Sequence, residues 1–221
     1  MANGSKFIAA FAAVMLCISS AAADNTSVAD KLNSLGLFHG TDNGYELESE
    51  LTREQGATMI VRLMGEEERV LETEYDPVFD DVKKDRWSFP YVMYCYKNKV
   101  TMGTSSTEFT PEENMTAQQY ICFILRLLGY THAEPETAGK LAVETGLISS
   151  SNVKRLEAAD KFLRDDMVYI SYSALKTRTA SGDILAYKLS DRGVISSDEA
   201  NKINPQTSAE TVGDLVDKFF E

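Results

Sequence analysis

Histidine, cysteine and tryptophan are scarce in this chain, whose 221 residues include two histidines, three cysteines and one tryptophan. The two histidines, His39 and His132, belong to no HExxH helix, and the sequence has neither a glycine-rich phosphate loop nor a GxSxG elbow. Two acidic groups, at residues 80–85 and 42–50, are candidate Ca²⁺ ligands. Neither has EF-hand spacing, so solvated turn carboxylates are the simpler interpretation. We therefore expect a non-catalytic protein without a cofactor or metal centre.

Positively charged residues are also fewer than negatively charged ones. Lysine and arginine number 22 against 34 aspartates and glutamates, which gives a formal net charge of −12. A chain this acidic repels nucleic acids at long range, so a nucleic-acid partner is not expected. Beyond the first segment, no stretch is hydrophobic enough to span a membrane.

The first segment has the pattern of an export signal. Lys6 precedes an apolar run over residues 7–18, and small residues lead to three alanines that end at Ala23. We expect residues 1–23 to be a cleaved signal peptide, which would leave a remainder with one positive charge fewer and a net charge of −13. An uncleaved membrane anchor is the alternative, although the run is shorter than the ~20 residues that span a bilayer. Cys17 lacks the small residues expected before a lipidated cysteine.

The two remaining cysteines, Cys95 and Cys122, both fall on apolar helical stripes. Unpaired buried cysteine is the simpler interpretation, and a disulfide between them is the alternative.

An internal repeat organises the rest of the chain. Residues 52–55 (Thr-Arg-Glu-Gln) and 116–119 (Thr-Ala-Gln-Gln) both match the capping box that starts a helix. An apolar stripe follows each box, and a glycine, Gly65 or Gly129, stands 13 positions after each threonine. The same cap, stripe and terminator at the same spacing indicate repeated helical units.

A third, less regular copy has the residues Leu-Arg-Asp-Asp at 163–166 in the place of the box. Leucine cannot cap a helix, so this start should be weaker by about 1 kcal/mol. Strand signals are few, and the fold class expected is all-α. Helices are expected over residues 28–35, 52–65, 88–99, 116–129, 163–176, 183–191 and 207–220, and residues 66–69 are expected to begin an acidic connector.

The second unit carries a recognisable pattern. Its residues Phe-Asp-Asp-Val at 79–82, then Trp87, Gly103 and Phe-Thr-Pro at 109–111, followed by the capped helix that ends Leu-Leu-Gly, resemble the S-layer homology (SLH) module. The first and third units resemble degenerate copies. The resemblance implies a pseudo-threefold spindle of three helix-loop-helix repeats with grooves between them, and an extra C-terminal helix follows. The segments are a signal peptide at 1–23, repeats at 28–67, 77–130 and 138–200, and the tail at 205–221.

The resemblance also implies a function. SLH domains hold secreted bacterial proteins non-covalently on the envelope, typically by binding a pyruvylated secondary cell-wall polysaccharide or another peptidoglycan-linked polymer. The family's ligand-binding arginine corresponds to Arg53 and Arg164, while Ala117 stands in its place in the second unit. Trp87 corresponds to the family's tryptophan. Gly40 and Gly103 correspond to its groove glycines. The expected location is the cell wall or S-layer of a bacterium.

Each of these assignments has a structural alternative. A cation at a helix N-terminus opposes the macrodipole, so Arg53 has a local reason to face an anion, beside what should be free backbone N–H groups. Alternatively, it pairs with Glu54 or Glu50 on a solvated face. Trp87 either stacks on a sugar or anchors the core of its unit.

A second function remains open from the sequence. The expected mature chain is almost entirely repeats, with no evident cargo domain for an anchor to hold. A protein-interaction module that assembles with itself or with another surface protein, through the amphipathic tail over residues 207–220, is therefore the alternative.

Overall fold

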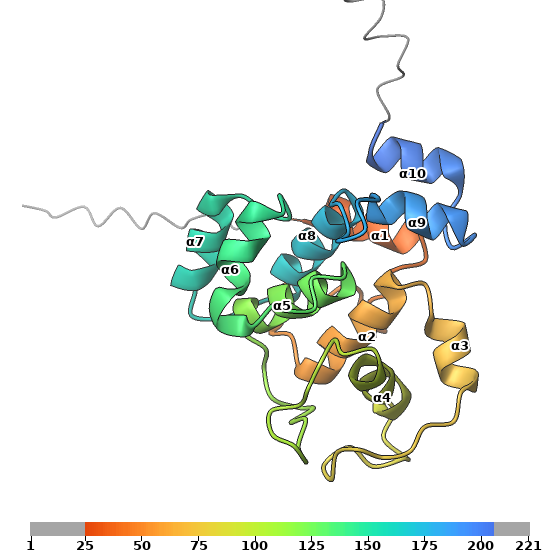
Figure 1. Cartoon of the computed structure of the whole chain (residues 1–221), viewed down its shortest axis with the longest axis vertical. Helices are drawn as coiled ribbons and strands as arrows, with labels where there is room; N and C mark the ends of the chain where they lie inside the picture. Colours follow the sequence, from red (N-terminus) through yellow and green to blue (C-terminus); the bar gives the residue numbers. More distant parts are fainter. Residues whose placement is uncertain (1–24, 206–221) are drawn as a thin grey trace, which may run out of the picture.

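The computed structural model describes residues 25–205, so the predicted signal peptide and the tail helix lie outside the described residues. Within this range the fold is all-α, with ten helices and no β-strand (Figure 1). The helices are α1 (Thr26–Ser34), α2 (Arg53–Leu63), α3 (Glu67–Glu72), α4 (Phe89–Lys97), α5 (Ala117–Leu127), α6 (Pro135–Glu144), α7 (Ser150–Ala158), α8 (Arg164–Leu175), α9 (Leu185–Asp191) and α10 (Ser197–Ile203). None of these ten is long and apolar enough to cross a membrane.

The two predicted capping boxes form. Thr52 accepts a hydrogen bond from the backbone N–H of Gln55, whose side chain accepts one from the N–H of Thr52, and Thr116 and Gln119 do the same at the start of α5. Leu163 makes no side-chain cap at the start of α8, as its chemistry requires. The sequence therefore located the starts of all three helices correctly.

Four helices, α3, α6, α7 and α10, were not predicted. Residues 66–69, expected to begin a connector, lead into α3, which is one and a half turns long and buries one apolar side chain, Val70. Of the other three, α7 and α10 start with serine caps, Ser149 and Ser196, and α6 has no side-chain cap. Short helices with few buried residues give little periodic signal, because packing rather than propensity stabilises them.

The helices pair across the boundaries of the sequence units. The outer helix α4 packs on α2, α6 packs on α5, and α1 packs on α8, whereas α2 and α8 each also contact α5. Figure 1 accordingly places α5 and α8 near the centre, with α6 and α7 on one side and α9 and α10 on the other. Each central helix thus carries an outer helix that belongs to a different unit.

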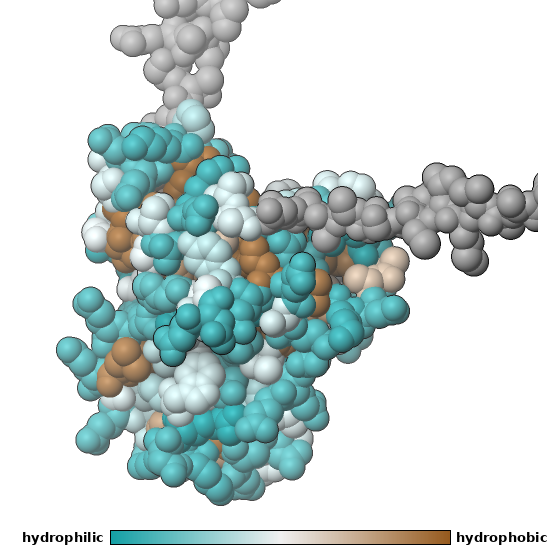
Figure 2. Space-filling view, turned by 180° about the vertical axis from the view of Figure 1, so that it is seen from behind, coloured by the Kyte–Doolittle hydropathy of each residue, from teal (hydrophilic) through white to brown (hydrophobic). Residues whose placement is uncertain are grey.

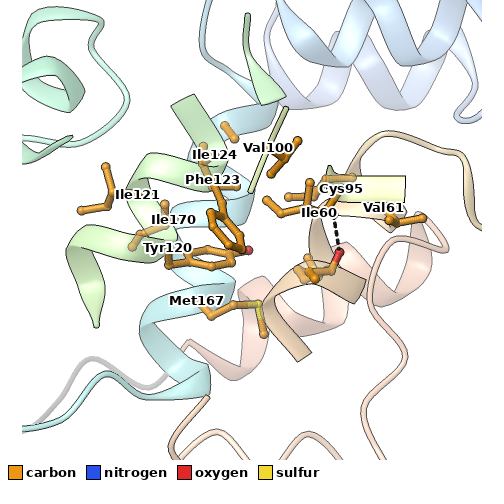
Figure 3. Packing of buried hydrophobic residues seen from close by; sticks show 14 of the residues in the cluster. Ile60, Val61, Cys95, Val100, Tyr120, Ile121, Phe123, Ile124, Met167 and Ile170 are labelled. Atoms are coloured by element: carbon orange, nitrogen blue, oxygen red, sulfur yellow. Dashed lines mark hydrogen bonds between the residues drawn. The ribbon is translucent and has the colours of Figure 1, made fainter. Parts of the chain in front are cut away.

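The core lies among the three central helices, α2, α5 and α8. Figure 3 shows Tyr120 of α5 pointing toward α8, where its hydroxyl lies 2.7 Å from the Oγ atom of Ser171. Cys95 and Cys122 are both buried and unpaired, and the thiol of Cys95 donates to the carbonyl of Ala57, as the dashed line in Figure 3 marks. Burial raises the pKa of both thiols, so they stay protonated.

The surface is mostly hydrophilic. On the face shown in Figure 2, apolar residues form small separate patches rather than one continuous area. The large hydrophobic side chains that are more than half exposed within the described range are Leu71, Trp87 and Met102. Only Trp87 lines one of the hollows described below.

Candidate ligand-binding groove

A groove of about 260 Å³ lies between α2 and α8. It is lined by Phe38, Gly40, Thr41, Leu51, Gln55, Thr58, Met59, Arg62, Trp87, Arg164 and Met167. The lining contains two arginines, an exposed tryptophan and no acidic residue, although the chain as a whole carries a net charge of −12. Three of the five site residues predicted from the sequence, Arg164, Trp87 and Gly40, therefore meet in one place.

Arg164 is the first residue of α8, and its side chain is almost wholly buried. Its Nε atom donates a hydrogen bond of 2.9 Å to the carbonyl of Tyr45, and its guanidinium lies 5.6 Å from the centre of the Phe38 ring. It forms no ion pair with any carboxylate of residues 25–205. The arginine is thus held by a backbone oxygen and an aromatic face, and its charge is left without a direct counterion.

The electrostatics of Arg164 follow from this burial. Desolvation lowers the pKa of its guanidinium, the nearby carboxylate of Glu46 opposes that change, and the positive charge of Arg62 adds to it. Arginine still remains charged at neutral pH. A bound anion would relieve both the desolvation and the repulsion between the two cations.

Trp87 lies in the turn before α4 and is 54% exposed, so the alternative that it anchors the core of its unit is wrong. Its ring centre lies 6.2 Å from that of Tyr91. An indole that lines a groove and stays accessible offers a flat apolar face to a ligand.

The neighbours of Trp87 fix its position. Arg86 donates two hydrogen bonds to the carboxylate of Glu54, at 2.7 and 2.9 Å, and Ser88 donates a third, at 2.6 Å. Arg86 also pairs with Glu112. Because Glu54 is the second residue of α2, these bonds fasten the chain on both sides of Trp87 to the helix that forms one wall of the groove.

Gly40 has a positive φ of 70°, and a Cβ atom there would lie 2.8 Å from the carbonyl oxygen of Gly44. The turn closed by the hydrogen bonds between Thr41 and Gly44 therefore needs glycine at this position. The turn lies at the edge of the groove, since Gly40 and Thr41 both line it.

Arg53 occupies a second, separate position. Its Nε atom donates to the carbonyl of Phe109 at 2.8 Å, and its guanidinium lies 4.7 Å from the Phe109 ring and 6.0 Å from that of Phe123. The Arg53 and Arg164 sites thus share one design, a buried arginine that is bonded through Nε to the backbone of a loop and covered by an aromatic ring. Arg53 does not line the groove that contains Trp87.

The surroundings of Arg53 differ in charge from those of Arg164. Desolvation lowers the pKa of Arg53, and two carboxylates, Glu113 and Asp81, act against that change. Asp81 also accepts hydrogen bonds from the backbone N–H groups of Phe109 and Thr110, so it belongs to the loop that covers Arg53.

Gly103, the fifth predicted site residue, belongs to this second region. Its φ is 85°, and a Cβ atom would lie 2.5 Å from the carbonyl oxygen of Ser105 and 2.6 Å from the Phe79 ring. The Phe79 ring packs on Phe109, the partner of Arg53. The turn therefore needs glycine at position 103, and Gly103 does not line the groove that contains Arg164 and Trp87.

Two sequence expectations about the arginines are wrong. The backbone N–H groups of Arg53 and Arg164 are not free, because they donate to the carbonyls of Glu113 and Ser49 in neighbouring loops. Arg53 is also not paired with an acid on a solvated face. Its candidate partners bond elsewhere, Glu54 to Arg86 and Glu50 to residues 114 and 161. A ligand of Arg164 would thus be bound by the guanidinium and not by the helix N-terminus.

Sequence reasoning did not single out the remaining polar groups in the groove, Gln55, Thr58 and Arg62. All three lie on α2, at one-turn spacings along the same side of the helix. Arg62 stands near the C-terminus of α2, where the helix macrodipole favours a basic residue. The sequence therefore gives no sign that Arg62 lines a groove.

Comparisons with known proteins agree with this picture over part of the chain. Residues 78–121 match the S-layer homology domain family. The chain is 30% identical over 118 residues to the Middle cell wall protein of Brevibacillus brevis, a match that covers 53% of this chain and 11% of that protein. It is 29% identical over 110 residues to the Surface layer protein of Brevibacillus choshinensis, covering 49% and 10%.

A third relative is of another kind. An Endoglucanase of a Bacillus species is 45% identical over 51 residues, which are 23% of this chain and 5% of the enzyme. The chain thus corresponds to a small part of each of these larger proteins. Within this chain, residues 78–121 form an S-layer homology domain.

Proposed function

We propose that this protein attaches non-covalently to a bacterial cell envelope by binding an acidic secondary cell-wall polysaccharide, of the pyruvylated kind, in the groove between α2 and α8. The observation that carries the proposal is the meeting of Arg164, Trp87 and Gly40 in a groove with no acidic residue. A guanidinium without a counterion suits a carboxylate, and an exposed indole suits the flat face of a sugar ring. The same groove offers no pair of residues for acid–base or nucleophilic chemistry, so the role proposed is binding and not catalysis.

The proposal includes the arrangement of the whole chain. We assign SLH-like units to residues 28–67, 77–130 and 138–200 and arrange them as a pseudo-threefold spindle. The pairing of α4 with α2, of α6 with α5 and of α1 with α8 supports this assignment, as does the matching design around Arg53 and Arg164. Of the three equivalent positions, only that of Arg164 combines the arginine with an accessible tryptophan.

The location of the relatives supports the same function. The proteins from both Brevibacillus species are named for the cell wall and the surface layer, and a third relative, from Thermoanaerobacter kivui, is a Cell surface protein that is 25% identical over 130 residues. We therefore place this protein on the outside of a bacterial cell, bound to the wall. Export is expected from the signal segment at residues 1–23.

Sedimentation with cell-wall sacculi tests the proposal. The purified protein is mixed with sacculi of the source bacterium before and after acid treatment that strips the secondary polysaccharide. We expect the protein to pellet with the intact sacculi and to stay in solution with the stripped ones. Equal sedimentation with both, or with neither, would contradict polysaccharide binding, and a concentration-dependent increase in the protein's own molecular mass would then favour the assembly role.

A further inference from the structure

Arg62 is a second cation at the groove, beside Arg164. It lies on the last turn of α2, where it lines the groove beside Arg164. It also lines an adjoining hollow of about 510 Å³, together with His39, Glu67 and Arg192. Arg62 therefore lines both hollows and stands between them.

A network of hydrogen bonds holds the Arg62 side chain in place. Its Nε atom donates to both carboxylate oxygens of Glu67 at 2.9 Å, and its Nη2 atom lies 2.9 Å from one of them. Glu67 also accepts a bond of 2.8 Å from the hydroxyl of Tyr91 and lies 3.5 Å from the Nε2 atom of His39. Burial, together with the nearby carboxylate of Glu67, raises the pKa of Tyr91 to about 12, so its hydroxyl remains a donor at neutral pH.

Arg126, the equivalent arginine of the second unit, is an arginine with a purely structural role. Arg126 stands ten residues after Thr116, as Arg62 stands ten after Thr52. Its Nε atom donates to the carbonyl of Ala133, its Nη1 to that of Val100, and its Nη2 to the carboxylate of Glu134. All three nitrogens are thus used within the chain.

Arg62 differs from Arg126 on this point. Its Nε and Nη2 atoms both bond to one carboxylate, that of Glu67, and no backbone carbonyl of residues 25–205 accepts a bond from it. The positive charge of Arg62 also acts on Arg164, although desolvation is the larger cause of the lowered pKa there. Two guanidinium groups thus face one groove whose lining includes no carboxylate to separate them.

We infer that Arg62 and Arg164 together bind one carboxylate of an acidic sugar, with Arg62 aimed into the groove by Glu67 and Tyr91. A carboxylate has about four lone-pair sites, so it can accept hydrogen bonds from two guanidinium groups. This inference rests on the proposed function and adds to Arg164 a second arginine that binds the ligand. It assigns selectivity for the charged sugar to a pair of arginines, since a neutral sugar would leave their repulsion in place.

Affinity measurements on four variants test the inference. Arg62→Gln, Arg62→Lys, Arg164→Gln and the matched control Arg126→Gln are titrated against intact sacculi, and a thermal melt of each variant measures the folded fraction. We expect Arg62→Gln to weaken binding about tenfold and Arg62→Lys to weaken it about threefold, because lysine keeps the charge but loses the planar fork. Arg126→Gln should lower the melting temperature and leave the affinity of the folded protein unchanged.

A double variant then separates shared from independent contacts. If both arginines bind one carboxylate, the loss in Arg62→Gln/Arg164→Gln is smaller than the product of the two single losses. A wild-type protein that does not bind sacculi would overturn the proposed function itself. Wild-type binding with unchanged affinity in both Arg62→Gln and Arg62→Lys would overturn only the present inference, as would strictly independent losses. Should Arg62→Gln not fold, the folded Arg62→Lys variant decides the matter.

Discussion

Arg164 and Arg53 are held in the same way but face different surroundings. Each donates through Nε to a loop carbonyl and lies against an aromatic ring, and each is almost wholly buried. Arg164 faces a groove with Trp87 and a second arginine, whereas two carboxylates act on Arg53. The comparison shows that the motif arginine by itself does not make a binding site, because the residues around it decide whether its charge is available to a ligand.

The largest expected effect comes from exchanging each arginine for glutamine in turn. Arg164→Gln removes a charge-assisted bond worth about 1.5–3 kcal/mol, so binding to sacculi should fall by about tenfold or more. Arg53→Gln should leave the affinity unchanged and destabilise the fold by about 1–2 kcal/mol, because a backbone bond and a contact with an aromatic ring are lost. Titration and chemical unfolding of both variants provide the two measurements.

If Arg53→Gln weakened binding as much as Arg164→Gln does, the proposed difference in ligand binding between the two regions would be wrong. That result would mean that the Arg53 position binds polymer in spite of Glu113 and Asp81.

A smaller effect is expected at Glu54, which links the two regions. Glu54 is adjacent to Arg53 in the chain, and its carboxylate holds Arg86 and Ser88 on either side of Trp87. Glu54→Gln should reduce the free energy of unfolding by about 2 kcal/mol, since the buried carboxylate accepts three charge-assisted or short bonds. It should also weaken binding, because Trp87 loses its fixed position. Denaturant unfolding, together with the fluorescence of this lone tryptophan, reports both changes.

Glu112→Gln is the matched control for Glu54→Gln. Glu112 also pairs with Arg86, but its side chain is 80% exposed, so its removal should cost less than about 1 kcal/mol. Equal destabilisation by both variants would show that Glu54 does not fix the turn.

The smallest effect concerns Trp87 itself. Because this side chain is 54% exposed, Trp87→Ala should change the free energy of unfolding by less than about 1 kcal/mol. The loss of an aromatic face should weaken binding about three- to tenfold, which corresponds to about 0.5–1.5 kcal/mol. Melting curves and sedimentation titrations measure the two effects, and unchanged affinity in Trp87→Ala would contradict a binding role for the indole.

The sequence was sufficient for the parts of the fold that local chemistry dictates. Thr52 and Thr116 cap helices because a hydroxyl followed by glutamine three residues later satisfies two backbone N–H groups, whatever surrounds it. The seven-residue α10 has the same box, at Ser196 and Glu199, and was overlooked because little apolar periodicity follows it. The six-residue α3 has no side-chain cap and buries only Val70.

The sequence was sufficient to predict residues of the candidate site, but not which of them lie together. Gly40, Trp87 and Arg164 come from three different stretches of sequence, and only the packing of the helices shows that they meet while Arg53 and Gly103 do not. Arg62 could have been identified by comparing it with Arg126 at the same repeat position. What separates the two arginines, however, is the identity of their hydrogen-bond partners, and those come from other helices.

The contact between α1 and α8 affects how the chain acquires its structure. Asn25, at the start of the described range, donates through its backbone and its side chain to the carboxylate of Asp165, 140 residues later. The ribosome therefore produces α1 long before its packing partner α8. The contact between α1 and α8 joins segments far apart in the sequence, and long-range contacts of this kind form slowly. A chain that stops short of α8 therefore lacks the helix on which α1 packs.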